Sequence, residues 1–196
     1  MYPLFETIAI EKFQPQNIEL HQQRMDISYL SLFKNTNPFN LSELIKYENI
    51  PSEGLFKWKI LYGCSNYKTI VDRYEPRQIN KVKFVHVDSN FDYTFKYSNR
   101  VQIDELRDIN SEYDEIIMVK NGYLTDSSIA NLVLKQKDKL YTPNTPLLEG
   151  TQRKYLIMKD RIIEKQILYK DLGDFEGVFF INSMLPFERA PFFKLD

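Results

Sequence analysis

The dipeptide Asn121-Gly122 separates two segments, residues 115–120 and 123–126, whose side chains are typical of β-strands. An Asn-Gly pair is the strongest short-range signal for a two-residue hairpin loop, because both of its residues adopt positive φ readily. The sequence therefore predicts an antiparallel hairpin in the second half of the chain, and any fold assigned to the chain has to contain it.

Hydrophobic patterning along the rest of the chain predicts a mixture of strands and helices. Strands are expected at residues 4–12, 55–64, 68–74, 81–87, 130–136, 139–142 and 177–181. Helices are expected at residues 17–33, about 40–49, 99–109 and 151–165. The short polar segment 87–91 is typical of a crossing between two lobes, so we expect an α+β fold divided into residues 1–88 and residues 89–196.

Charge and cysteine content narrow the classes of function. The 26 basic and 27 acidic side chains leave a formal net charge of −1, which gives no support to a nucleic-acid or membrane-surface partner. No apolar run approaches the roughly 18 residues of a membrane span, and the N-terminus lacks the basic region of a signal peptide. The single cysteine, Cys64, lies in an apolar stretch and is expected to be buried and inert. We expect a cytoplasmic protein without a metal site.

Four positions could carry chemistry, although each also has an ordinary structural explanation. Gly150 opens a predicted helix whose free amides would favour a phosphate, or it marks a common loop-to-helix turn. Arg24 shares a helix face with His21 and could bind a phosphate bidentately, or it faces solvent. Lys96 lies among aromatic residues, where desolvation lowers the pKa of an amine, but most lysines are inert. Asp126 could bind a ligand through its carboxylate, or it could simply belong to a turn between two strands.

These positions belong to six short motifs that occur between Phe5 and Pro186, nearly the whole chain. The motifs are Phe5-Glu6-Thr7, His21-Gln22-Gln23-Arg24, Lys96-Tyr97-Ser98-Asn99-Arg100, Asp126 with Asn131, Gly150-Thr151-Gln152-Arg153, and residues 180–186. Their order resembles that of the class IV aminotransferases, a family that includes branched-chain and D-amino acid aminotransferases and 4-amino-4-deoxychorismate lyase. The resemblance implies the family's two-lobed fold, here shortened at the N-terminus.

The resemblance also implies pyridoxal 5'-phosphate as cofactor and gives each motif a role. Lys96 falls where the family has its Schiff-base lysine, and it is the expected catalytic residue. Arg24 matches the arginine that binds the cofactor phosphate, and Asp126 matches the glutamate that pairs with the pyridine nitrogen. The backbone amides of Thr151 and Gln152 occupy the place of those that hold the phosphate.

Substrate contacts and departures from the family pattern complete the prediction. Asn182 and Glu6 are the expected substrate-binding residues, because the segment around Asn182 resembles the lyase and Glu6 belongs to the strand motif before the substrate pocket. Asp126 replaces a glutamate and Gln152 replaces the common threonine.

The motifs Lys96-Tyr97-Ser98-Asn99-Arg100 and residues 180–186 are closest to the lyase branch of the family. The first expectation is therefore a homodimeric 4-amino-4-deoxychorismate lyase of folate biosynthesis, which releases 4-aminobenzoate and pyruvate from a small-molecule amino substrate. An aminotransferase acting on branched-chain or D-amino acids is the main alternative. A relative that keeps the fold without catalysis is the second alternative, motivated by the shortened N-terminus and the two substitutions.

Overall fold

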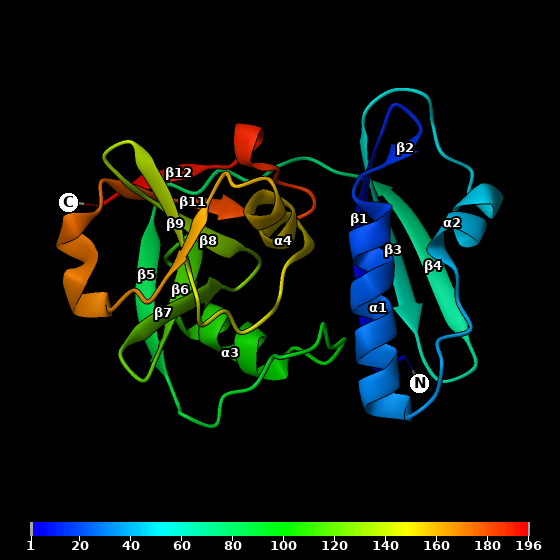
Figure 1. The fold of residues 1–196 in the computed structure, drawn as a ribbon, viewed down its shortest axis with the longest axis horizontal. Helices are drawn as coiled ribbons and strands as arrows, with labels where there is room; N and C mark the ends of the chain where they lie inside the picture. The colour runs from blue at the N-terminus through cyan, green and yellow to red at the C-terminus, as the bar shows by residue number, and fades with distance from the viewer. Residues whose placement is uncertain (1, 196) are drawn as a thin grey trace. The chain divides into compact units, whose positions relative to one another are not determined.

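The computed structural model describes residues 2–195, and these residues form two compact units. Of the described residues, 2–76 and 95–99 belong to the first unit, and 77–94 and 100–195 belong to the second. Figure 1 shows the path of the chain through the helices and strands of each unit. The mixed architecture agrees with the α+β fold expected from the sequence.

The first unit is a four-stranded antiparallel sheet with the order β2-β1-β3-β4 and a long helix packed on it. Its elements, in chain order, are β1 (Leu4–Glu11), β2 (Gln14–Pro15), α1 (Ile18–Phe33), α2 (Leu41–Leu44), the 3₁₀ helix η1 (Ile45–Tyr47), β3 (Leu55–Tyr62) and β4 (Tyr67–Arg73). Strand β3 alternates between buried and partly exposed residues, as a strand with one covered face should. Met25 and Tyr29 of α1 pack on Trp58 and Ile60 of that strand in one apolar core.

The second unit is built on a mixed sheet with the strand order β10-β9-β8-β7-β6-β5, and β11 joins it by pairing with β8 and β12. Its strands are β5 (Val82–Val87), β6 (Glu115–Lys120), β7 (Tyr123–Ser127), β8 (Asn131–Gln136), β9 (Lys139–Pro143), β10 (Ile163–Lys165), β11 (Gly177–Ile181) and β12 (Phe192–Lys194). Its helices are α3 (Val101–Ile109) and α4 (Thr151–Met158), with 3₁₀ helices η2 (Tyr169–Asp174) and η3 (Phe187–Arg189). Leu156 of α4 packs with Val133 and Ile181 of the sheet.

The structure divides the chain elsewhere than the predicted break at residues 88 and 89. Strand β5 pairs in parallel with β6, which ties it to the second unit. Residues 95–99 return to the first unit, where the Phe5 amide donates to the Lys96 carbonyl at 3.0 Å and the Ser98 amide donates to the Pro3 carbonyl at 2.8 Å. Lys96 therefore belongs to the first unit, whereas the sequence assigned it to the second half.

Two further expectations need correction. The helix expected at residues 151–165 ends at Met158, because Asp160 adopts a positive φ of 52° and the chain then forms β10. Ile162, which extends the apolar pattern of this helix, packs from the following loop into the same cluster as Leu156. Cys64 is exposed, because it lies in the turn between β3 and β4.

The hairpin at Asn121-Gly122 is confirmed. Asn121 and Gly122 have φ of 53° and 82°, and Lys120 pairs with Tyr123 across the turn. Two successive positive φ values are those of a type I′ turn, whose twist matches that of the strands.

This turn predicts a difference between two glycine substitutions in the second unit. Gly122→Ala should lower the free energy of unfolding by about 1 kcal/mol, because alanine is strained at positive φ. Gly173→Ala is the matched control, since a Cβ at either glycine meets nothing within 4 Å but only Gly122 has a positive φ. Urea denaturation of both variants measures the difference, and equal effects would contradict the role of backbone conformation.

Candidate cofactor site

Three polar side chains of the first unit form a buried cluster between β1 and α1. Glu6 lies on β1, and His21 and Arg24 lie three residues apart on one face of α1. Arg24 Nε donates to Glu6 Oε1 at 2.9 Å, and Arg24 Nη2 donates to Glu6 Oε2 at 2.5 Å. His21 Nδ1 lies 2.7 Å from Glu6 Oε2. The carboxylate thus holds the guanidinium group by two bonds and fixes its plane.

Burial and charge determine the protonation of this cluster. Glu6 and His21 are fully buried, and the Arg24 side chain is 12% exposed. Burial raises the pKa of Glu6, but the Arg24 charge and the bonds from His21 and Arg24 outweigh it and lower the pKa to about 2. Burial lowers the pKa of His21 despite its bond with Glu6. At neutral pH Glu6 is therefore ionised and His21 is neutral, so His21 donates its Nδ1 hydrogen to the carboxylate.

Lys96 lies in the same unit as this cluster. Its backbone carbonyl accepts the Phe5 amide, and its Nζ lies 4.7 Å from the centre of the Phe5 ring. The charge of Lys96 is one of the influences that lower the pKa of His21. The first unit therefore brings together the predicted cofactor lysine and the predicted phosphate arginine.

The second unit places Asp126 at the end of β7 opposite Asn131 at the start of β8. Asp126 Oδ1 accepts a hydrogen bond from Asn131 Nδ2 at 2.7 Å, and Oδ2 accepts one from the Leu148 amide at 2.9 Å. Burial raises the pKa of Asp126 to about 7, although the bonds from Leu148 and Asn131 favour the ionised form. The carboxylate is thus oriented by two donors and titrates near neutrality.

Helix α4 begins directly after Gly150, and its first three residues are buried. Thr151 and Gln152 are 4% and 5% exposed. The amides of a first helical turn lack partners within the helix and, together with the helix dipole, favour an anion. The predicted phosphate amides therefore lie in the same unit as Asp126.

Arg153, the last residue of that motif, has a structural role that the sequence did not reveal. It is 2% exposed, and its Nη2 donates to the Pro143 carbonyl at 3.0 Å and to Glu164 Oε1 at 2.5 Å. Its Nη1 donates to Glu149 Oε2 at 2.9 Å. Arg153 thus braces α4 against β9 and β10.

Asn182 follows β11 and closes a turn. Its Oδ1 accepts hydrogen bonds from the amides of Met184 and Leu185 at 2.8 and 2.9 Å. Its Nδ2 donates to the Ile129 carbonyl at 3.0 Å, which ties this turn to the loop between β7 and β8. Three bonds to the backbone therefore fix this predicted substrate residue.

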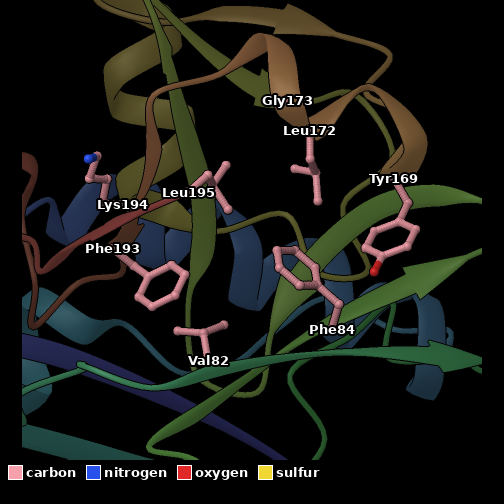
Figure 2. Close-up of a pocket in the computed structure, with 8 residues that line it drawn as sticks. All are labelled: Val82, Phe84, Tyr169, Leu172, Gly173, Phe193, Lys194 and Leu195. Atoms are coloured by element: carbon pink, nitrogen blue, oxygen red, sulfur yellow. The ribbon is translucent and has the colours of Figure 1, made fainter.

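The second unit has a pocket that is lined by residues of β5, η2 and the C-terminal segment that includes β12. Figure 2 shows its lining, which consists of Val82, Phe84, Tyr169, Leu172, Gly173, Phe193, Lys194 and Leu195. The lining is mostly apolar, and no member of it is a predicted cofactor or substrate residue. The pocket is therefore not counted as part of the cofactor site.

Among residues 2–195, no helix is long and apolar enough to cross a membrane.

Known proteins resemble this chain along most of its length. The model of the class IV amino-transferase family matches residues 67–188. An uncharacterized protein of Haemophilus influenzae is 37% identical over 186 residues, which are 94% of this chain and 98% of that protein. A crystal structure from Haemophilus somnus 129Pt, described as a candidate 4-amino-4-deoxychorismate lyase, is 36% identical with a TM-score of 0.89, over 95% of this chain and 98% of that one.

More distant structures share the fold. A candidate amino-acid aminotransferase from Mesorhizobium loti is 18% identical with a TM-score of 0.80, over 98% of this chain and 99% of that one. A hypothetical aminotransferase from Mycobacterium tuberculosis in its PLP-bound form is 15% identical with a TM-score of 0.76, over 97% of this chain and 79% of that one.

The family match and the shared fold define a pyridoxal-phosphate-dependent enzyme. The chain belongs to the class IV aminotransferase family. The side chains present fit the cofactor in each unit. The first unit offers an amine and a partly exposed, oriented guanidinium, and the second offers a buried carboxylate and the start of a helix.

The raised pKa of Asp126 predicts a pH dependence of stability in the protein without cofactor. The folded state retains a proton that the unfolded chain releases between pH 3.8 and about 7. The stability of wild type relative to Asp126→Asn should therefore fall as the pH rises through this window and level off above it. The slope approaches about 1.4 kcal/mol per pH unit.

Urea denaturation from about pH 3 to 8 measures this difference. Glu188→Gln is a control of opposite sign, because the bond from Arg161 lowers the pKa of Glu188. Wild type should gain stability over that variant as the pH rises through the acidic range. A constant difference between wild type and Asp126→Asn from pH 4 to 7 would show that the carboxyl group titrates normally.

Proposed function

We propose that this enzyme is a 4-amino-4-deoxychorismate lyase, which releases 4-aminobenzoate and pyruvate. The observation that carries the proposal is the 36% identity, over 95% of the chain, to the Haemophilus somnus structure described as a candidate for this activity. The resemblance of residues 96–100 and 180–186 to the lyase branch supports it. As that resemblance implies, the proposed enzyme is a homodimer of folate biosynthesis. We also propose that it is cytoplasmic, as the sequence predicts.

Lys96 is the proposed catalytic residue. Pyridoxal phosphate supplies an electron sink for the charge that develops on a substrate carbon. Lys96 would hold the cofactor through its side-chain amine, and the same amine, when free, would remove the ring proton of the substrate. Its place beside the Phe5 ring shelters one side of the amine from water.

Arg24 is the proposed side-chain ligand of the phosphate. Glu6 already orients its guanidinium group through two bonds, so little conformational freedom is lost when an anion binds. In the second unit, the amides of Thr151 and Gln152 are the proposed backbone ligands of the phosphate.

Asp126 is the proposed partner of the pyridine nitrogen. A carboxylate beside a ring nitrogen stabilises the protonated ring. The bonds that Asp126 accepts from Asn131 and Leu148 orient its carboxylate, which supports this assignment.

Asn182 and Glu6 stay predicted substrate residues. A substrate contact by Asn182 would use its remaining Nδ2 hydrogen, because its Oδ1 already accepts two amides and its Nδ2 already donates to Ile129. Glu6 is fully buried and both of its oxygens accept bonds from Arg24 or His21, so its direct effect in the structure is on Arg24.

The internal bonding of Asn182 favours a second candidate function. If Asn182 stabilises the turn and does not contact the substrate, the segment around it does not determine that the reaction is that of the lyase. The enzyme would then be a class IV aminotransferase that uses branched-chain or D-amino acids, and it would need a keto acid as second substrate.

Turnover measurements separate the two functions. Purified enzyme given 4-amino-4-deoxychorismate should release 4-aminobenzoate and pyruvate in equal amounts without an added keto acid. Faster turnover of leucine or D-alanine with 2-oxoglutarate would show that the enzyme is an aminotransferase. Asn182→Ala should slow the lyase reaction and leave cofactor bound if the residue contacts the substrate.

Covalent attachment identifies the lysine. Borohydride reduction of the cofactor-loaded enzyme followed by peptide mass analysis should place the added mass on Lys96, because only the Schiff-base amine is trapped. Lys96→Ala should bind the cofactor only non-covalently, so borohydride should leave no cofactor mass on the protein. Modification of Lys120 or Lys154 in its place would assign the role to another residue.

A further inference from the structure

Asn131 ties Asp126 to the segment that precedes α4. It is 6% exposed, and its Nδ2 donates to Asp126 Oδ1 at 2.7 Å and to the Leu148 carbonyl at 2.9 Å. An asparagine amide has two hydrogens, so both are used in these bonds. A rotation of this side chain would therefore break two hydrogen bonds at once, of which the one to Asp126 is buried.

The same group of residues closes a ring of hydrogen bonds. The Leu148 amide donates to Asp126 Oδ2 at 2.9 Å, while the Leu148 carbonyl accepts from Asn131. One carboxylate, one side-chain amide and one peptide unit thus determine each other's orientation. Buried hydrogen bonds of this kind are costly to leave unmade, so the ring resists partial opening.

Gly150 fits tightly against this ring. A Cβ added to Gly150 would lie 1.8 Å from Asn131 Oδ1 and 3.0 Å from Asn131 Cγ. The backbone of Gly150 has φ −73° and ψ 140°, which any L-residue adopts. Glycine is therefore required at the start of α4 by the position of the Asn131 side chain and not by backbone conformation.

We propose that Asn131 is a positioning residue that holds the Asp126 carboxylate and the first turn of α4 in one fixed geometry. The proposal rests on the assignment of Asp126 to the ring nitrogen and of the Thr151 and Gln152 amides to the phosphate. One buried amide then controls the spacing between the groups that bind opposite ends of the cofactor. Gly150 completes the interlock, because it alone leaves room for the Asn131 oxygen.

A double-mutant cycle in the protein without cofactor tests the interlock. In wild type, Gly150→Ala should raise the equilibrium constant for unfolding by about five- to a hundredfold, because the new methyl group overlaps Asn131. In the Asn131→Ala background, the same substitution should have an effect smaller by roughly tenfold, because the overlapping atoms are gone. Gly173→Ala, where a Cβ meets nothing within 4 Å, should act equally in both backgrounds.

A second readout distinguishes positioning from general stabilisation. Without the Asn131 donor the ionised form of Asp126 is less favoured, so the upper end of its titration should move above pH 7 in Asn131→Ala. Asn110→Ala is the matched control, because Asn110 Nδ2 donates to the Leu106 carbonyl in the same unit. It should leave the pH profile unchanged. If Asn131→Ala does not fold, Asn131→Ser serves as the background, since it also lacks the overlapping oxygen.

Cofactor binding supplies the third readout. Asn131→Ala should weaken the binding of pyridoxal phosphate, measured by fluorescence titration, by about tenfold or more, whereas Asn110→Ala should not. Additive effects in the cycle, an unshifted pH profile, or wild-type affinity in Asn131→Ala would each overturn the proposal. Absence of lyase turnover in wild type would refute the proposed function alone, because the cycle and the pH profile need neither cofactor nor substrate.

Discussion

The first unit depends on the ion pair and hydrogen bonds that the buried Glu6 carboxylate forms with helix α1. A charge removed from water is tolerated only with close partners, and Arg24 and His21 of α1 supply them. Strand β1 and helix α1 therefore have one arrangement that satisfies this group. Arg24 is also the proposed ligand of the phosphate. The hydrogen bonds between Glu6 and Arg24 therefore fix the position of α1 and also orient the guanidinium group that would bind the phosphate.

The elements of the fold were largely predictable because their signals are local. The turn at Asn121-Gly122 and the alternation in β3 follow from neighbouring residues. The early end of α4 was missed because Ile162 continues a helical pattern while packing from a loop. The position of residues 95–99 was missed because their partners, Pro3 and Phe5, lie about ninety residues earlier in the chain.

The candidate site shows the same limit. Residue type and order in the sequence predicted roles for Lys96, Arg24, Asp126 and the start of α4, since these groups carry chemistry that has few substitutes. Hydrogen-bond networks were not visible in the sequence, because each partner is chosen by the folded backbone. The bonds of Asn182 to Ile129, Met184 and Leu185 are an example, and they alter the interpretation of a residue that the sequence singled out. An acidic residue in the apolar strand LFETIAIE was the available clue to the Glu6 cluster.

The return of residues 95–99 to the first unit makes that unit discontinuous in sequence. During synthesis on the ribosome, β1 emerges long before the segment that contains Lys96. The hydrogen bond from the Phe5 amide to the Lys96 carbonyl can therefore form only after about ninety more residues have been added. A genetic crossover between relatives after residue 76 would likewise keep Arg24 from one parent and take Lys96 from the other. The lysine and the arginine can therefore be inherited separately, although they fold as one unit.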